Sequence, residues 1–384
     1  MYAVPYVLLI IIFGGLAFYG QTQDKSAKKL MALGAMALLF LFFGFRGFIC
    51  DDWQIYYPGF KEVEADDITF AVYGIGKGLD WHMEPGFTLL MYLCKCIFND
   101  YFFFQAVCSL INVALLYNFL RNRIDDIPFG IVLFICFGGY GMMTNMMRNS
   151  IAILIFANAI TYIEQRKPLP YFALILVAFT FHTTALIYFP LYFFAHFKLN
   201  KWIYLGIFIA LNVIFLAHIS IIGNIISMVI GDGDSRVSGM TDAYTSGDLA
   251  EAKGISIGYL ERVLTGSLIF CYYDKLIAMR KENKIFINLF VMYLLATFIL
   301  ADFQVLSERM GNLFIVSYWI LWSDLTHAFS ISNNRRLFIA FITLYCIMKM
   351  VGLTNLVTSE YDNVLFGAKS YEQRLYIHNR TGDK

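Results

Sequence analysis

The sequence predicts an all-α, polytopic integral membrane protein with about 11 to 14 transmembrane or re-entrant helices. Of its 384 residues, 59% are apolar and only 15% are charged, whereas a water-soluble chain carries about 25% charged residues. The apolar residues form long runs, for example 4–20, 30–49 and 202–220. A spanning helix needs about 20 mostly apolar residues, and its main-chain groups must be bonded internally. We therefore expect a single transmembrane domain over residues 1–384, surrounded by the lipid bilayer.

Lys and Arg collect in alternate short loops, and this pattern predicts the orientation of the chain. Loops rich in Lys and Arg face the cytoplasm, and here they are 21–29, 121–126, 164–167, 198–201, 280–284 and the loop with Arg335 and Arg336. The alternating loops 50–82 and 231–254 are acidic. We expect these two loops to lie outside, together with the N-terminus and the C-terminal tail that starts at about residue 353.

Two apolar stretches do not fit simple spans. Residues 86–98 are too short to cross the bilayer, and a run long enough to span follows at 101–120. If both crossed, every later basic loop would face outward, so we interpret 86–98 as a partial helix that enters from the outside. Residues 171–194 are interrupted near His182 and Pro190. They form either a helical hairpin or one broken span.

Ionisable residues at membrane depth indicate a functional site by default, because they are costly there. With the topology above, four Arg lie at or near the outer boundary: Arg46, Arg148, Arg262 and Arg309. Five other ionisable residues accompany them: Asp51, Asp52, Glu84, His182 and Glu308. Arg grips phosphate with a planar fork of donors, and a helix start near Arg148 or Arg309 adds free N–H groups. The pattern favours an external site for a phosphate group at headgroup level.

Other interpretations of these residues stay open. A boundary Arg can extend to lipid headgroups, and ion pairs such as Asp51 with Arg46 or Glu308 with Arg309 can lock helices together. His182 can serve as a hydrogen bond between helices. The aromatic residues of the first outer loop can stack on sugars or form an interfacial belt; they are Trp53, Tyr56, Tyr57 and Trp81.

Several classes of function are disfavoured. The net charge is only +1, so no basic field points to nucleic acid. Nearly all of the seven Cys lie in apolar runs, and Cys94 and Cys96 lack both the CxxC spacing and a second pair, so a metal or redox centre is not expected. The acidic run 232–234 lacks the ligands of a calcium loop further along, where Arg236 and Val237 stand.

The order of the unusual residues resembles the EpsG family, a branch of the Wzy-type polymerases of bacterial exopolysaccharide, capsule and O-antigen. The likeness rests on Arg46 at the end of an early helix, Asp51 or Asp52 and Tyr56 just after it, and three short motifs. These motifs are Glu-x-Gly-Phe at 84–87, Arg-Asn-x-Ile-Ala at 148–152 and Phe-His-Thr-Thr-Ala at 181–185. The resemblance covers most of the chain in order and hydropathy, and it is least specific in the C-terminal third.

The resemblance implies an enzyme of the bacterial inner membrane with its site facing the periplasm or outside. Its reaction would transfer a growing glycan from undecaprenyl pyrophosphate onto the next lipid-linked repeat unit, without a metal or other cofactor. A chain-length regulator and a flippase are the protein partners to be expected. On this reading the leaving pyrophosphate is bound by Arg148, Arg46, Arg309 and Arg262, and the acceptor hydroxyl meets Asp51, Glu84 or His182 as a base.

Three other functions compete with the polymerase. A ligase that moves the finished glycan to another acceptor would need the same Arg site and stays open. A nucleotide-sugar transferase would place its catalytic groups on the cytoplasmic side, against the predicted topology. A flippase would need charge along a path through the mid-membrane, whereas here the charges gather at one face.

Overall fold

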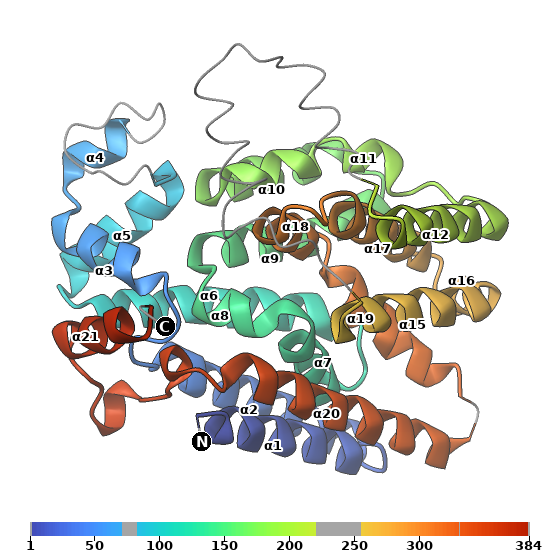
Figure 1. The fold of residues 1–384 in the computed structure, drawn as a ribbon, viewed down its shortest axis with the longest axis horizontal. Helices are drawn as coiled ribbons and strands as arrows, with labels where there is room; N and C mark the ends of the chain where they lie inside the picture. Colours follow the sequence, from blue (N-terminus) through green and yellow to red (C-terminus); the bar gives the residue numbers. More distant parts are fainter. Residues whose placement is uncertain (1, 71–82, 220–254, 330, 383–384) are drawn as a thin grey trace. The chain divides into compact units, whose positions relative to one another are not determined.

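The computed structural model describes residues 2–70, 83–219, 255–329 and 331–382 (Figure 1). The predicted all-α class is confirmed: the described residues are helical apart from loops and one isolated bridge between Arg46 and Asn363. They pack as two compact units. Unit 1 comprises Met1–Tyr192 and Phe329–Lys384, and unit 2 comprises Phe193–Ala328.

Unit 1 contains most of the long helices. Its helices are α1 (Val4–Gly20), α2 (Lys25–Gly44), α3 (Trp53–Glu62), α4 (Ala65–Phe70), α5 (Pro85–Ile97), α6 (Tyr101–Arg121), α7 (Ile127–Phe134), α8 (Tyr140–Thr144), α9 (Met147–Glu164), α10 (Pro168–Phe181), α20 (Ser332–Thr354) and α21 (Tyr371–Gly382). Short turns complete it: η1 (Ile135–Gly139), η2 (Thr183–Tyr188), η4 (Val357–Ser359) and η5 (Val364–Phe366). Among the residues that the structure describes, four segments are long and apolar enough to span a membrane: α2, α6, the run Ile127–Thr144, and α20 from Asn333.

Helix starts in unit 1 follow from local chemistry. Asp24, Asp100 and Asp126 each accept a hydrogen bond from a main-chain N–H of the first turn that follows, in α2, α6 and α7. Pro85 and Pro168 open α5 and α10, where their missing N–H groups cost nothing. Helix α9 is buried along nearly its whole length between α6 and α10, and it forms the core of the unit.

Unit 1 has two polar ends, on either side of its apolar middle. At the first, which we call the Arg148 end, α2 ends, α9 begins, and Arg46 donates from Nη2 to Thr144 O at 3.3 Å. At the opposite end, Arg123 pairs with Glu164 at 3.5 Å, and Gln21 donates to Asp126 Oδ2 at 2.6 Å. The sequence assigned the loops of the second end to the cytoplasm.

Helix α5 is short, and both of its termini lie at the Arg148 end of unit 1. Its first turn lies beside Glu84, which pairs with Arg148. Near its last turn, Lys95 Nζ donates to the main-chain oxygens of Lys61 and Val63 at 2.7 and 2.8 Å. Only three residues then lead to the start of α6. The structure therefore has a partial helix where the sequence predicted one.

The chain turns back on itself at His182. After α10 ends, η2 and α11 (Leu191–Phe194) return along the same helix. Tyr171 Oη donates to Tyr188 O at 2.5 Å, and the rings of Phe172 and Phe189 stack with centroids 5.5 Å apart. Of the two alternatives left by the sequence, the structure has the helical hairpin, with His182 at its tip.

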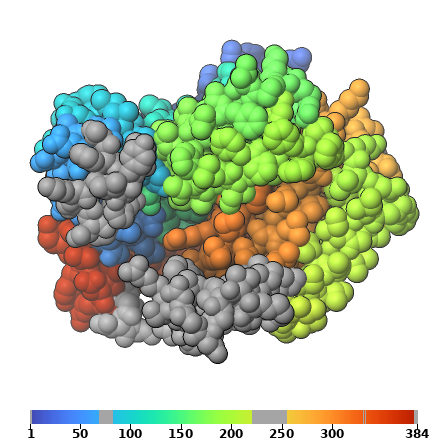
Figure 2. Space-filling view, turned by 90° about the horizontal axis from the view of Figure 1, so that it is seen from above, coloured from blue at the N-terminus to red at the C-terminus, as the bar shows by residue number. Residues whose placement is uncertain are grey.

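The C-terminal segment 357–382 lies across the Arg148 end. Its helix α21 lies beside α3 in Figure 1, and in Figure 2 the red surface of the C-terminal end adjoins the blue surface of the N-terminal part. The rings of Tyr57 and Tyr371 stack there with centroids 4.5 Å apart. The tail that the sequence expected outside from about residue 353 thus contacts the loop after α2.

Unit 2 consists of shorter apolar helices and their connections. They are α12 (Lys201–Leu216), α15 (Ile257–Cys271), α16 (Tyr273–Met279), α17 (Asn283–Ile299), α18 (Gln304–Asn312) and α19 (Val316–His327). Helix α17 packs against α12, α18 and α19. The acidic loop 231–254 lies outside the described residues.

Candidate active site at the Arg148 end of unit 1

An ion pair between Arg148 and Glu84 is the centre of the site. Arg148 stands in the first turn of α9, and Glu84 directly precedes Pro85 at the start of α5. Arg148 Nη1 lies 2.6 Å from Glu84 Oε2, and the two side chains are 23% and 11% exposed. The other carboxylate oxygen accepts a hydrogen bond from Thr183 N at 3.1 Å. One carboxylate therefore ties together α9, α5 and the tip of the hairpin.

Tyr56 extends the network from Arg148 to Asp52. Arg148 Nε donates to Tyr56 Oη at 3.4 Å, and Tyr56 Oη donates to Asp52 Oδ2 at 3.4 Å. Burial and the charge of Asp52 raise the pKa of the Tyr56 phenol to about 12, although Arg148 opposes them. The hydroxyl therefore keeps its proton at neutral pH. It accepts a hydrogen bond from the guanidinium of Arg148 and donates one to the carboxylate of Asp52.

Asn145 holds the loop that carries Asp52. It lies in the break between α8 and α9, and its Oδ1 accepts from the main-chain N–H groups of Asp51 and Asp52, both at 3.0 Å. The preceding residue, Cys50, has a left-handed backbone with φ 62°. That conformation costs a residue with a side chain about 1–2 kcal/mol, so the loop depends on the contacts that hold it.

His182 forms the turn of the hairpin and connects it to α9. Its Nδ1 accepts from Thr184 N at 3.2 Å and lies 2.8 Å from Thr184 Oγ1. Thr184 Oγ1 in turn donates to Asn149 Oδ1 at 3.3 Å. Because Nδ1 accepts a main-chain N–H, the neutral ring carries its proton on Nε2. His182 is thus held next to Thr183, which bonds to Glu84.

Arg46 is buried and bonded to the main chain. Its guanidinium is part of a side chain only 4% exposed, and it donates from Nη1 to Phe43 O at 2.8 Å and from Nη2 to Thr144 O. Burial lowers the pKa of this guanidinium from its ordinary value. In this position Arg46 fastens the end of α2 to the end of α8.

Replacement of Arg46 by Met should therefore lower stability. We expect a loss of about 1.5–3 kcal/mol, the range for a hydrogen bond to a charged group, because two buried carbonyls lose their donor. Thermal unfolding of the detergent-solubilised protein measures it, with Arg121→Met as control, since Arg121 is exposed at the opposite end. Full stability together with loss of activity would instead place Arg46 in contact with substrate.

The structure puts the remaining outer-loop candidates in other surroundings. Asp51 Oδ1 lies 2.9 Å from His378 Nε2 of α21. Trp53 is buried, donates from Nε1 to Cys50 O at 2.8 Å, and packs on Tyr371. Tyr57 stacks on the same Tyr371 ring. Trp81 lies outside the described residues.

Arg262 and Arg309 belong to unit 2. Arg262, on α15, donates from Nε to Tyr293 Oη at 3.2 Å, and its guanidinium lies 5.8 Å from the centroid of that ring. Arg309 is exposed on α18. Of the four predicted Arg, the structure therefore places Arg46 and Arg148 in unit 1, and the other two in the second compact unit.

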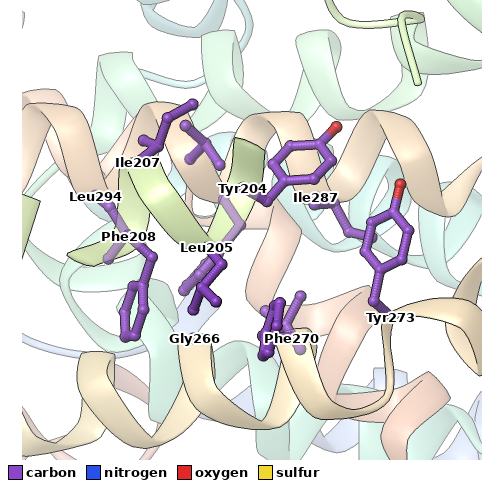
Figure 3. Close-up of a pocket in the computed structure, with 12 residues that line it drawn as sticks. Tyr204, Leu205, Ile207, Phe208, Gly266, Phe270, Tyr273, Ile287 and Leu294 are labelled. Atoms are coloured by element: carbon purple, nitrogen blue, oxygen red, sulfur yellow. The ribbon is translucent and has the colours of Figure 1, made fainter. Parts of the chain in front are cut away.

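Unit 2 also contains a small apolar pocket, with a cavity volume of about 30 Å³, between α12, α15, α16 and α17. Tyr204 and Tyr273 stand on one side of it, and Leu205, Phe208 and Leu294 are among the apolar residues that line the rest (Figure 3). No charged side chain lines the pocket. It offers packing surface but no acid, base or anion-binding group among its lining residues.

The assembled groups suit a reaction with an anionic leaving group. A guanidinium, two carboxylates, a phenol and an imidazole meet within four hydrogen-bonded segments. Within the described ranges, no three His, Cys, Asp or Glu residues are grouped to hold a metal ion. The cation can bind an anion, and the imidazole and carboxylates can handle a proton.

Sequence reasoning missed several members of this network. Asp52 was named beside Asp51, but only Asp52 bonds to Tyr56, which had been proposed as a stacking surface for sugars. Asn145 and Thr183 were not singled out. Only their positions in the sequence could have pointed to these two residues. Asn145 precedes Arg148 by three residues at a helix break, and Thr183 follows the residue that interrupts an apolar run.

Comparison with known proteins identifies a family but no individual relative. The model of the EpsG family matches residues 29–365, which is most of the chain and includes every segment of the network described above. Neither the curated proteins nor the solved structures contain a match.

Proposed function

The chain belongs to the EpsG family, and from that premise we propose that it is a bacterial polysaccharide polymerase of the Wzy type. Its substrates are undecaprenyl-pyrophosphate-linked oligosaccharide repeat units, which it joins at the outer face of the cytoplasmic membrane. The observation that carries this proposal is the network of Arg148, Glu84 and Tyr56 at one polar end of the unit that contains the four candidate spans. A lipid-linked diphosphate holds its charge at headgroup level, which is the depth at which the sequence predicts this polar end to lie.

In the proposed reaction a sugar hydroxyl of the incoming repeat unit attacks the anomeric carbon of the growing glycan. A carbon–oxygen bond forms, the bond from that carbon to the pyrophosphate oxygen breaks, and undecaprenyl pyrophosphate leaves with the electron pair. Arg148 is assigned to the departing pyrophosphate, because fixed donors aimed at developing negative charge contribute most to such steps. Glu84 and Tyr56 hold its fork in place.

The hydroxyl proton passes to a base on the acceptor side. Three residues remain candidates: His182, Glu84 and Asp51. Glu84 already accepts from Arg148 and Thr183, and Asp51 accepts from His378 when that ring is protonated on Nε2. Both carboxylates therefore already have hydrogen-bond donors. His182 stands at the hairpin tip next to Thr183, and imidazole is the side chain whose unperturbed pKa lies nearest neutral pH.

Purified protein in liposomes with a defined lipid-linked repeat unit provides the direct test. We expect a ladder of products whose spacing equals one repeat unit. A protein that makes no ladder but transfers the glycan to a different lipid or protein acceptor would be a ligase, which the same Arg site would also serve. Transfer of the intact lipid-linked sugar across the bilayer without a new bond would identify a flippase.

The orientation of the chain in the membrane provides a second test of the proposal. We expect Cys introduced for Glu64, which is exposed after α3, and for Asp242 in the second acidic loop to react with a membrane-impermeant thiol reagent in intact cells. Cys introduced at Lys25 in the first basic loop is the control and should react only after permeabilisation. The reverse pattern would put the site in the cytoplasm and contradict the proposed reaction.

A further inference from the structure

The loop between α2 and α3 is held from outside by the C-terminal segment 357–382. Three main-chain hydrogen bonds join them. They run from Val364 N to Phe45 O, from Gly47 N to Asp362 O and from Cys50 N to Thr358 O, all at 2.8–2.9 Å. This contact spans more than 300 residues of sequence. It borders the same loop that presents Asp52 to Tyr56 and Arg148.

Arg374 is the most buried charged residue of this contact. It belongs to α21, its side chain is only 3% exposed, and its Nε donates to Phe48 O at 2.6 Å. Its Nη1 pairs with Glu360 Oε2 at 2.9 Å, and its Nη2 donates to Glu360 O. Glu360 also pairs with Lys369 at 2.9 Å. A single guanidinium therefore fixes the loop, the turn at 357–360 and the C-terminal helix to each other.

The loop needs such a support because of its own geometry. Cys50 adopts a left-handed backbone, which residues with side chains rarely keep unless their surroundings enforce it. Gly47 packs so closely that an added Cβ would lie 1.9 Å from Asp362 Oδ1. Tyr371 adds a stacked ring on Tyr57 and an edge contact with Trp53, just ahead of Tyr56.

We propose that Arg374 is a positioning residue for the site, and that the C-terminal segment sets the geometry of Asp52, Tyr56 and Arg148. The inference rests on the proposed polymerase function and deepens it. Helix α21 lies beyond residues 29–365, which the EpsG family model matches. Arg374 touches no reacting group; it acts through Phe48 and Glu360.

The loop contains its own reporter. Cys50 is half-buried, with Sγ 3.3 Å from Tyr140 Oη, while Cys96 and Cys271 are exposed and can be changed to Ser. In that background the rate of Cys50 alkylation measures release of the loop, independent of any turnover. Cys94, Cys108, Cys136 and Cys346 are buried in the fold. Their continued protection shows that a variant is folded.

The test compares Arg374→Met, Arg374→Lys and Arg380→Met, which changes an exposed Arg on the same helix. We expect Arg374→Met to increase the rate of Cys50 alkylation, with single-exponential kinetics. We also expect it to lower kcat for the lipid-linked repeat unit about tenfold or more, because reacting groups that are misplaced react more slowly. Arg374→Lys keeps one donor and should restore part of both values. Arg380→Met should match the wild type, and Gly47→Ala should reproduce Arg374→Met from the other side of the contact.

Two results would overturn the proposal. Unchanged Cys50 alkylation in Arg374→Met would show that the segment does not hold the loop. Faster alkylation with unchanged kcat would show that the loop does not position the site. Failure of the proposed function looks different, since the wild-type chain itself would then make no polymer while its Cys50 stayed protected.

Discussion

Arg148→Lys is expected to reduce polymer synthesis by about a hundredfold or more, the effect of removing one preorganised donor from an oxyanion site. Lys keeps the positive charge but has one compact ammonium in place of a planar fork. Arg148 uses Nη1 for Glu84 and Nε for Tyr56, which leaves the rest of the fork for a phosphate. An ammonium cannot serve all three at once.

The measurement is the initial rate of product formation in liposomes that contain equal amounts of inserted protein. Arg121→Lys is the matched control, because Arg121 lies at the opposite end of unit 1 and bonds to Asn118 on its own helix. Near-normal rates in Arg148→Lys would show that a point charge is sufficient. Arg148 would then be a boundary residue that reaches lipid headgroups.

Loss of the proton acceptor should have an effect of similar size. We expect at least one of Glu84→Gln and His182→Gln to slow polymerisation about a hundredfold or more, the lower end of general-base effects. Each amide can keep a hydrogen bond but cannot take the proton. Wild-type rates in both variants would exclude these two side chains as the base and leave Asp51 or a mechanism without a base.

The structure sharpens this experiment at His182. Nδ1 of the ring accepts from Thr184 N and thereby caps the turn of the hairpin. Asn at this position places an oxygen near Nδ1, whereas Gln reaches the position of Nε2. If His182 only caps the turn, His182→Asn should be active and fully stable. If the ring exchanges a proton with substrate, His182→Asn should fold normally and be inactive.

The sequence was sufficient for the fold class, and it also singled out ionisable residues that the structure brings together at the Arg148 end. Composition and apolar run length determine that the chain is helical and membrane-embedded. Charge at membrane depth is rare, so Arg148, Glu84 and His182 stand out without any structure. The break at His182 was visible too, but a hairpin and a broken span need the same number of residues, and only the contact of Tyr171 with Tyr188 distinguishes them.

The pairing of residues could not be read from the sequence. Glu84 and Arg148 are 64 positions apart, and their meeting depends on the partial helix α5 packing against α10 beside the hairpin tip. Tyr56 illustrates a second limit, because a Tyr near a span end suggests a belt or a stacking surface whichever way its hydroxyl points. Arg374 illustrates a third: it lies in a polar tail whose composition gives no sign of burial.

The ion pair at the centre of the site has a thermodynamic consequence for turnover. In the proposed reaction the carboxylate of Glu84 stays on Nη1 of Arg148 while the pyrophosphate binds the remaining donors of the same guanidinium. The two anions then share one cation and repel each other, which limits the affinity for the leaving group. This repulsion ends when undecaprenyl pyrophosphate departs, so it favours release. In the Glu84→Gln variant described above, product inhibition by undecaprenyl pyrophosphate should therefore become stronger, and unchanged inhibition would show that the two anions do not share Arg148.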